Sequence, residues 1–190
     1  MLPHSESAPS QWVERFVRLI PSGLALDLVC GMGRHSRLMA AHGMQVLAVD
    51  RDATALQSLA SDAIRTRCLD LEVEDLSNAR DLLQPDRFAG IVVTNYLHRP
   101  LLPLLFESLI DGGVLIYETF AEGNGAFGKP SSPNFLLKHG ELLEAVKQSA
   151  CRLHVVAFED GFQNTPRPAM VQRLCAIRVG ALPSPQAMVL

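Results

Sequence analysis

Two acids and two glycines stand close together near the start of the chain. The segment LALDLVCGMG places Asp27 before Gly31 and Gly33, and the segment QVLAVD ends on Asp50. Each acid lies in or at the end of an apolar run of the kind that forms buried strands. Glycines directly after a strand permit a tight turn and a close approach of the backbone to a ligand. These four residues therefore predict one half of a nucleotide-shaped pocket.

The chemistry of this pocket follows from Asp50 and from the helix predicted after the glycines, at 33–42. The start of a helix presents free N–H groups and the positive end of the helix dipole. An acid that ends the second strand is placed to accept hydrogen bonds from both ribose hydroxyls. The ligand is therefore predicted to carry a ribose.

Ser36 and Asp27 argue against a dinucleotide as that ligand. Ser36 takes the place of the third glycine in the pattern G-x-G-x-x-G. A carboxylate at Asp27 would repel a pyrophosphate and attract a cationic amino end. S-adenosylmethionine, which carries an ammonium and a sulfonium beside a ribose and an adenine, is the cofactor that fits. A capping or turn role is the alternative for Asp27.

The elements that must position these residues alternate between strand and helix. This alternation predicts an α/β fold, with a Rossmann-like, doubly wound, seven-stranded and mostly parallel sheet. The last two strands follow each other without a helix, which indicates a C-terminal antiparallel hairpin. The predicted strands are 24–29, 45–50, 64–69, 88–95, 112–120, 152–160 and 170–179, and the predicted helices are 10–20, 33–42, 52–61, 101–110 and 140–149.

The length and the net charge of the chain limit the classes of protein to which it can belong. The 190 residues are expected to form a single domain, 1–190, with a frayed Ser- and Pro-rich start at 1–10. The net charge is −3 and no basic stripe is present, so nucleic acid is an unfavourable partner. No apolar run approaches the roughly 20 residues of a membrane span, and the start does not resemble a signal peptide. These features predict a cytoplasmic protein.

Cysteine and histidine are too dispersed in the sequence for a metal site, so none is predicted. No two of the cysteines are close enough for a Cys-x-x-Cys clip. They are expected to be buried free thiols in a reducing compartment. The four cysteines are Cys30, Cys68, Cys151 and Cys175.

The stretch DLVCGMGRHSRLMAAHGMQVLAVDRD resembles the nucleotide-binding half of class I S-adenosylmethionine-dependent methyltransferases. The resemblance covers nearly the whole chain. Within that superfamily the sequence is similar to the small bacterial tellurite-resistance-like methyltransferases, through FLLKHGELLEAV and the late AFEDGF. One departure is Val29, at a position where the superfamily often has glycine, so the loop is expected to tolerate a β-branched residue there.

The resemblance implies roles at the methionine and ribose parts of the cofactor. Asp27 would hold the amino end through water or backbone. Gly31 and Gly33 would line the methionine part. Asp50 would bind the ribose hydroxyls, and Arg51 would lie beside the adenine.

The resemblance also implies contacts to the adenine and to the methyl group. Asp70, in CLDLE, matches the acid that reaches the adenine amino group, and Leu71 would offer its backbone N–H. Asn95, at the end of the fourth strand, stands where the superfamily places residues that face the methyl group. The alternative for Asp70 is an ordinary exposed acid, because other acids crowd nearby.

The segment NYLHRP after the fourth strand is predicted to serve the methyl acceptor. Tyr96 would pack on the adenine or face the substrate. His98 is a candidate general base, because imidazole groups titrate near neutral pH. A base is needed only if the acceptor carries a proton, since the donor is already activated and the protein mainly aligns the acceptor. Alternatively, His98 and Arg99 cap the following helix.

The Gly- and Pro-rich loop 121–139 is predicted to be an active-site lid or a fixed wall. Glu118 and Thr119, at the end of the fifth strand, are either catalytic or a structural pair. Arg167 and Arg173 would hold an anionic acceptor or lie in solvent. The helix around Trp12 would cover the cofactor or contribute the tryptophan to the core.

The predicted function is transfer of a methyl group from S-adenosylmethionine to a small molecule, because the short chain leaves no room for an added recognition domain. Three alternatives remain open. They are a methyltransferase for RNA or protein that needs a partner, a non-catalytic S-adenosylmethionine-binding protein, and a nicotinamide-dependent reductase. Ser36 and Asp27 disfavour the reductase.

Overall fold

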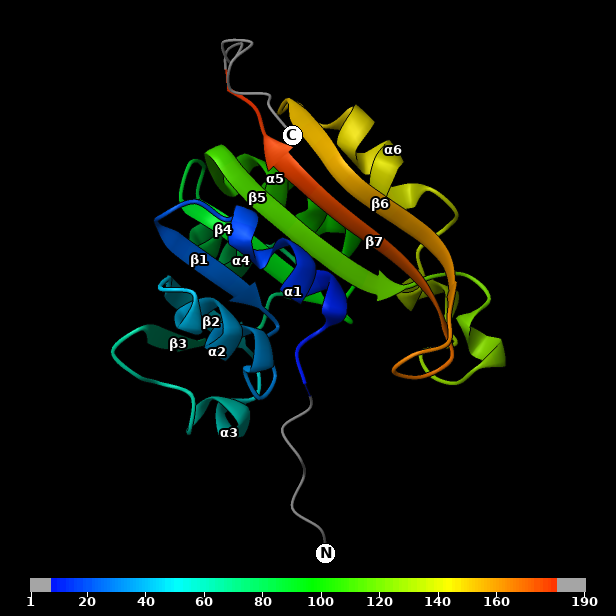
Figure 1. The fold of residues 1–190 in the computed structure, drawn as a ribbon, viewed down its shortest axis with the longest axis horizontal. Coiled ribbons are helices and arrows are strands. Elements are labelled where there is room, and N and C mark those ends of the chain that lie inside the picture. The colour runs from blue at the N-terminus through cyan, green and yellow to red at the C-terminus, as the bar shows by residue number, and fades with distance from the viewer. Residues whose placement is uncertain (1–7, 181–190) are drawn as a thin grey trace, which may run out of the picture.

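Seven strands form one sheet at the centre of the molecule, which a computed structural model describes from residue 8 to residue 180 (Figure 1). Residues 1–7, most of the segment that we expected to be frayed, lie outside the described range. Strand β4 is buried at nearly every position, as expected for a strand covered on both faces. The strands are β1 (Leu24–Leu28), β2 (Gln45–Asp50), β3 (Ile64–Cys68), β4 (Phe88–Thr94), β5 (Leu109–Phe120), β6 (Leu153–Gln163) and β7 (Ala169–Arg178).

The strand order is β3-β2-β1-β4-β5-β7-β6. The first five strands of this order run parallel, and β7 pairs antiparallel with both β5 and β6. The prediction of a mostly parallel, seven-stranded sheet with a C-terminal antiparallel hairpin is therefore confirmed. The chain order reverses between β1 and β4, and in such sheets ligands bind beyond the carboxyl ends of the strands at that point.

Helices cover both faces of the sheet (Figure 1). Side chains of the first three helices pack into one apolar core with the sheet, and side chains of the last three pack into a second core on the opposite face. The helices are α1 (Gln11–Phe16), α2 (Arg34–Ala41), α3 (Ala53–Leu56), α4 (Ser77–Leu82), α5 (Leu102–Ser108) and α6 (Glu141–Gln148), with single 3₁₀ turns η1 (Val17–Leu19), η2 (Arg99–Leu101), η3 (Asn124–Ala126) and η4 (Pro133–Phe135).

The start of β5 was predicted wrongly. The sequence placed a helix at 101–110 and a Gly-Gly turn before the strand, but α5 ends at Ser108 and β5 begins at Leu109. The strand continues through both glycines instead of starting after them, and Gly113 leaves room for the Ile110 carbonyl oxygen, from which a Cβ would lie 2.8 Å. The pairing with β4 shifts register at the same place.

Helix boundaries also differ from the prediction in the first half of the chain. The helix expected over 52–61 extends only from Ala53 to Leu56. Helix α4 was missed, although Ala79 and Leu82 stand at helical spacing and are fully buried. The acids and Asn78 around this short segment obscured its apolar stripe.

None of the helices within residues 8–180 is long and apolar enough to cross a membrane. The four cysteines are free thiols. Cys30 and Cys175 are buried, but Cys68 is exposed and Cys151 is half-buried, so the expectation of burial was wrong for Cys68.

Candidate functional site

The loop between β1 and α2 turns through left-handed backbone conformations. Gly31 has a φ of 53° and Gly33 a φ of 76°, values that favour glycine. A Cβ at Gly33 would lie 2.3 Å from Leu59, whereas a Cβ at Gly31 would meet no protein atom within 4 Å. Gly33 therefore permits close packing inside the protein, and Gly31 leaves open space where a ligand can approach the backbone.

Val29 also adopts a left-handed conformation, with a φ of 56°. A β-branched residue rarely adopts such a value, and strain of this kind gathers at functional sites. The departure from the superfamily pattern noted in the sequence therefore falls at a position whose geometry favours glycine.

Asp50 joins the glycine loop to the end of β2. Its Oδ2 accepts a hydrogen bond from the Gly31 N–H at 2.8 Å, and its Oδ1 accepts one from the Asp52 N–H at 2.9 Å. The side chain is nearly buried. Because each carboxylate oxygen has a second lone pair, Asp50 fixes the loop and still has capacity to accept two ribose hydroxyls.

Asp27 lies on β1, before the glycine loop, and is buried. The Ser36 hydroxyl donates a hydrogen bond to its Oδ2 at 2.5 Å. Burial raises the pKa of Asp27 to about 7 despite this hydrogen bond. Ser36, at the position of the third glycine, therefore has a structural role, because it gives the buried Asp27 carboxyl group a hydrogen bond. A cationic ligand nearby would favour the ionised form of this carboxyl group.

A pocket of about 100 Å³ opens beside this loop at the carboxyl edge of the sheet. It brings together four of the predicted cofactor residues and Tyr96, and it adds three residues that the prediction did not assign to the site. The lining residues are Val29, Asp50, Arg51, Leu69, Asp70, Leu71, Glu72 and Tyr96. The other predicted residues do not line it: Asp27, Gly31, Gly33, Asn95 and His98.

Two acids of this pocket, Asp70 and Glu72, lie on a turn after β3 that hydrogen bonds stabilise. The Glu72 N–H donates to Asp70 Oδ1 at 2.9 Å, and the Asn78 side-chain amide donates to the Asp70 carbonyl at 2.8 Å. Glu72 is the missed residue with the clearest signal in the sequence, because it stands two positions after Asp70 in CLDLE. Crowding by acids made this stretch look like solvated surface.

The loop after β4 is held by β5. Asn95 has a φ of 55°, and its N–H donates to the Glu118 carbonyl at 2.9 Å. The buried Tyr117 hydroxyl donates to the Tyr96 carbonyl at 2.7 Å. His98 precedes η2 without a capping hydrogen bond from its side chain, so its role as a side-chain cap is not seen. Its Nε2 is buried and has no hydrogen-bond partner within the described residues.

A second polar cluster, formed by Ser10, His35, Thr94 and Glu118, connects Ser10 to the sheet. The Ser10 N–H donates to His35 Nε2 at 3.0 Å, and the Ser10 hydroxyl donates to Glu118 Oε1 at 2.9 Å. Thr94 Oγ1 lies 3.4 Å from His35 Nδ1. Burial, aided by the charge of Arg34, lowers the pKa of His35 to about 3. The imidazole is therefore neutral and its Nε2 acts as the acceptor.

The structural alternative is favoured for Glu118, but its partner is Arg173 and not Thr119. Arg173 donates to Glu118 Oε2, and to Glu159 Oε2 at 2.9 Å. This arginine is neither solvated nor available for an anionic acceptor. Trp12 is a core residue: it is buried, packs edge-on against Phe16 at 4.6 Å and donates from Nε1 to the Leu174 carbonyl at 3.4 Å.

Loop 121–139 is anchored at both ends. Asn124 is buried and bonds to the Pro130 carbonyl and the Met170 N–H. Arg99, expected as a cap, instead binds the Glu141 carboxylate at 2.6 Å and the Leu136 carbonyl at 2.8 Å. Between these anchors Phe127 and Phe135 are exposed.

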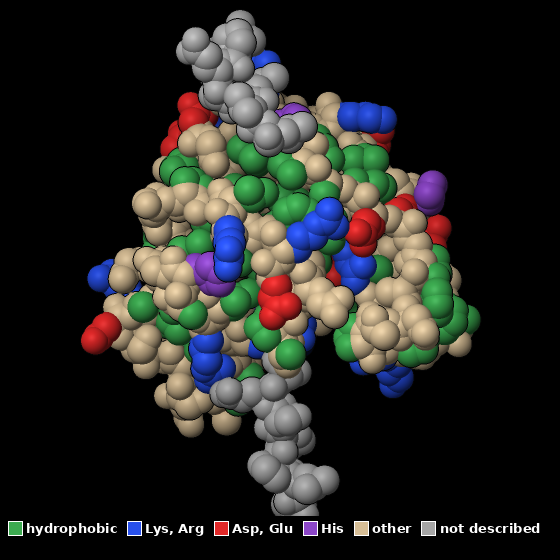
Figure 2. Space-filling view, in the orientation of Figure 1, with side chains coloured by type: hydrophobic (Ala, Val, Ile, Leu, Met, Phe, Trp, Pro, Cys, Tyr) green, Lys and Arg blue, Asp and Glu red, His purple; other side chains and the backbone are tan. Residues whose placement is uncertain are grey.

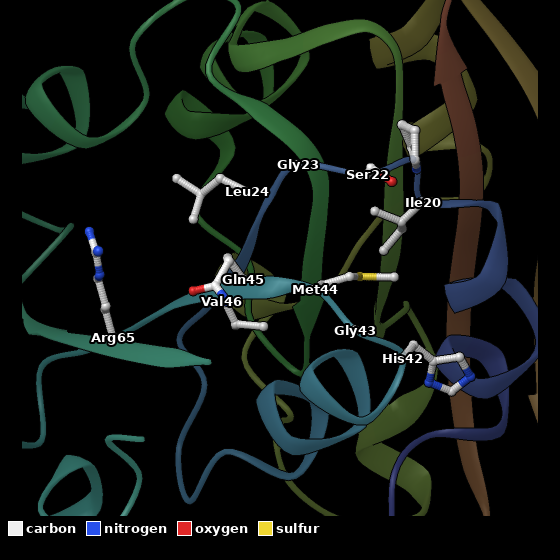
Figure 3. A pocket seen from close by; sticks show the side chains of 11 residues that line it. Ile20, Ser22, Gly23, Leu24, His42, Gly43, Met44, Gln45, Val46 and Arg65 are labelled. Atoms are coloured by element: carbon white, nitrogen blue, oxygen red, sulfur yellow. The ribbon is translucent and has the colours of Figure 1, made fainter. Parts of the chain in front are cut away.

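A larger cavity, of about 480 Å³, lies at the opposite edge of the sheet (Figure 3). Leu24 and Gln45, the first residues of β1 and β2, contribute to its lining, together with Met44 and Arg65. In Figure 3 the Arg65 and His42 side chains lie at opposite sides of the view and do not converge. The chemistry-bearing residues of this protein gather at the other edge.

The fold has close structural relatives among methyltransferases. TehB from Haemophilus influenzae is 18% identical with a TM-score of 0.70; the match covers 93% of this chain but only 64% of that protein. An S-adenosylmethionine-dependent methyltransferase from Methanosarcina mazei is 12% identical with a TM-score of 0.65, and the match covers 92% and 100% of the two chains.

A third relative was solved with ligands. The 1,6-didemethyltoxoflavin-N1-methyltransferase of Burkholderia thailandensis, with 1,6-didemethyltoxoflavin and S-adenosylhomocysteine bound, is 15% identical with a TM-score of 0.61. The match covers 89% of this chain and 76% of that protein. At these identities the likeness establishes a fold shared with class I S-adenosylmethionine-dependent methyltransferases.

The family follows from the sequence itself. The profile of the family described as tellurite resistance protein TehB matches residues 6–112, more than half of the chain. A comparison with curated proteins found no match to this chain. The chain belongs to the TehB family.

Proposed function

We propose that this protein is an S-adenosylmethionine-dependent methyltransferase that acts on a small molecule. The observation that carries the proposal is the pocket at the carboxyl edge of the sheet, where Asp50, Arg51, Asp70 and Leu71 meet beside the open glycine loop. Membership in the TehB family supports it.

The residues present fit an adenosyl cofactor. Asp50 has spare lone pairs for two ribose hydroxyls, Gly31 faces open space, and Asp27 is a buried acid suited to a cationic amino end. Arg51 and Leu71 would lie along the adenine. When bound, the cofactor supplies a methyl group on a positively charged sulfur.

The chain would contribute alignment of the acceptor, exclusion of water and, where the acceptor holds a proton, its removal. Asn95 and His98 follow β4 on the edge where the methyl group would point. The buried, unpartnered Nε2 of His98 is an atom that could accept a proton from an acceptor. Loop 121–139, anchored through Arg99 and Asn124, would close the outer side of this space.

A small acceptor is favoured over RNA or protein. On the face seen in Figure 2, Lys and Arg are interspersed with Asp and Glu, without a continuous basic area over the described residues. A phosphate backbone needs several clustered cations. The Burkholderia relative, whose bound 1,6-didemethyltoxoflavin is a small molecule, supports the same class.

Calorimetric titration with S-adenosylmethionine, S-adenosylhomocysteine and NADH tests the proposal. Micromolar binding of both adenosyl ligands without binding of NADH is expected. Formation of S-adenosylhomocysteine in the presence of a panel of small acceptors would then separate an enzyme from a binding protein. Absence of adenosyl binding would refute the proposal.

A further inference from the structure

A buried histidine follows the glycine loop directly. His35 lies in the first turn of α2, two positions after Gly33, and its side chain is almost completely buried. Its Nε2 accepts the Ser10 N–H at 3.0 Å. Because this nitrogen accepts, the proton of the neutral ring lies on Nδ1, which is 3.4 Å from Thr94 Oγ1. The imidazole thus connects α2 to the segment before α1 and to the last residue of β4.

Residues 8–10, the segment before α1, are held from two sides. On the side of α2, the Arg34 guanidinium donates to the Ala8 carbonyl at 3.2 Å, in addition to the bond from the Ser10 N–H. On the side of β5, the Ser10 hydroxyl donates to Glu118 Oε1 at 2.9 Å. In Figure 1 this segment, in dark blue, runs beside α2 before α1 begins. It therefore joins the helix that follows the glycine loop to the end of β5.

The first turn of α2 sets the position of the glycine loop. Gly33 is the residue before α2, and it packs so closely on Leu59 that a Cβ would lie 2.3 Å away. Gly31 faces open space, where the proposed cofactor would approach the backbone. A contact that fixes α2 at its first turn therefore also fixes the backbone that would meet the ligand, and such preorganisation increases affinity.

The bond between Ser10 and His35 stabilises both of its partners. A buried acceptor costs free energy unless it is paired, and the donor for this imidazole comes from 25 positions away in sequence. If Ser10 moved away, Nε2 would have to be hydrated and the first turn of α2 would be exposed to solvent. The positions of residues 8–10 and of the glycine loop therefore depend on each other.

We propose that His35 is a positioning residue for the cofactor: by accepting the Ser10 N–H it holds residues 8–10 against α2 and keeps the glycine loop in its binding geometry. The inference rests on the proposed function. It assigns a role in cofactor binding to a segment that does not line the pocket. By linkage, a ligand held by the loop should in turn strengthen the contact between Ser10 and His35.

Two substitutions of Ser10 isolate the bond to His35. Both Ser10→Ala and Ser10→Pro remove the hydroxyl that bonds to Glu118 and caps α1. Only Ser10→Pro also removes the N–H, and the φ of −63° at this residue is one that proline adopts. In calorimetric titration of the full chain, S-adenosylhomocysteine should bind Ser10→Pro about fivefold more weakly than Ser10→Ala, because the ligand must then order the loop without this hydrogen bond.

His35 provides the second half of a double-mutant cycle. In the background of His35→Ala, the two Ser10 variants should bind the ligand equally, because no bond is left for the proline to remove. His35→Gln retains a side-chain acceptor, and the difference between the two Ser10 variants should persist. A difference that persists in His35→Ala would assign the effect to another contact of Ser10 and overturn the proposal. The two Ser10 variants remain decisive by themselves if His35→Ala does not fold.

His42→Ala is the matched control. His42 is an exposed histidine at the other end of the same helix, and its Nδ1 lies 2.9 Å from the Leu38 carbonyl oxygen. The substitution removes an imidazole and a hydrogen bond from α2 without affecting Ser10. Affinity for S-adenosylhomocysteine should therefore remain at the wild-type value.

Hydrogen exchange measures the same linkage from the opposite direction. Saturating S-adenosylhomocysteine should slow exchange of the Ser10 amide in the wild-type protein by about fivefold, the factor by which loss of the bond weakens ligand affinity. Exchange resolved by residue in nuclear magnetic resonance provides the measurement. A histidine with a purely structural role would protect this amide equally with and without the ligand.

The two levels of the proposal fail differently. If the wild-type protein does not bind S-adenosylhomocysteine, the proposed function falls. If it binds, but Ser10→Pro and Ser10→Ala have equal affinities, only the role of His35 is overturned. The same conclusion follows if the ligand leaves exchange of the Ser10 amide unchanged, or if His42→Ala weakens binding as much as the loss of the bond.

Discussion

The carboxyl edge of the sheet has two halves, one at β1, β2 and β3 and the other at β4, β5 and β7, and they differ in how far apart in sequence their contacting residues are. At the ends of β1, β2 and β3, the contacts join residues close in sequence: Ser36 to Asp27 across 9 positions, and Gly31 to Asp50 across 19. At the ends of β4, β5 and β7, Ser10 reaches Glu118 across 108 positions, and Arg173 reaches Glu118 across 55. The half that we propose binds the cofactor is thus a local motif, and the half that we propose binds the acceptor is assembled from distant segments of the chain.

This difference indicates what each half can vary. A local motif of turn residues and strand-end acids suits a single ligand whose shape does not change. The proposed acceptor half, which is formed by distant segments, can vary without disturbing the proposed cofactor half. Changes in one half should therefore leave the function of the other largely intact.

Asp50→Ala should have the largest effect. It removes the acceptor for the Gly31 N–H of the loop, for the Asp52 N–H after β2 and for the proposed ribose hydroxyls, so affinity for S-adenosylhomocysteine should fall by about a thousandfold. Calorimetry provides the measurement. Asp52→Ala is the control, because Asp52 only caps α3 and its loss should cost about 1 kcal/mol of stability with binding retained. Unchanged binding in Asp50→Ala would refute the ribose assignment.

His98→Ala tests the acceptor half. Turnover should slow by about a hundredfold if the histidine removes a proton from the acceptor, while affinity for S-adenosylhomocysteine should stay within a factor of about two because His98 does not line the cofactor pocket. The exposed His154 provides a matched control, His154→Ala, with no expected effect. A loss of cofactor affinity in His98→Ala would show that the two halves are not separable there.

Asp27 should make the cofactor half sensitive to pH. In the folded chain its pKa is about 7, against 3.8 as the ordinary value, so the folded state holds a proton that the unfolded state releases. Stability should therefore fall as pH rises from about 4 to about 7 and then level, with a total on the order of a few kcal/mol. Asp27→Asn should abolish this fall in urea denaturation between pH 5 and pH 8.

The same group predicts how the cofactor binds. Affinity of the wild-type protein for S-adenosylhomocysteine should rise by up to about tenfold per pH unit below pH 7, because the cationic amino end favours ionised Asp27. Asp27→Asn should give a flat profile. A pH dependence that survives in the variant would assign the titration to another group.

Val29→Gly should have the smallest effect. Glycine adopts the observed φ of 56° without strain, and the loop contacts of Asp50 are unaffected, so cofactor affinity should stay within about threefold. Calorimetry with S-adenosylhomocysteine measures it. A loss beyond tenfold would mean that the valine side chain, which lines the pocket, contributes directly to binding.

The sequence by itself determined the sheet and the positions of the turn glycines and strand-end acids, Asp27 and Asp50. Strand patterns, turn glycines and the acids at Asp27 and Asp50 are local features, and the physics that they encode acts over a few residues. The predicted boundaries of helices and strands were wrong where packing against distant residues decides them. Strand β5 continues through Gly113, and α4 forms because its apolar side chains pack into the core.

Only the tertiary structure decided the long-range contacts at the ends of β4 and β5 and the surroundings of the pocket residues. Nothing local in the sequence reveals that Arg99 binds Glu141, that Ser10 meets His35, or that the Tyr117 hydroxyl holds the Tyr96 carbonyl. Such facts depend on which distant side chains the fold brings together and on the solvent it excludes. Burial and pairing are properties of the whole chain, because each residue's surroundings are supplied by segments far away in sequence.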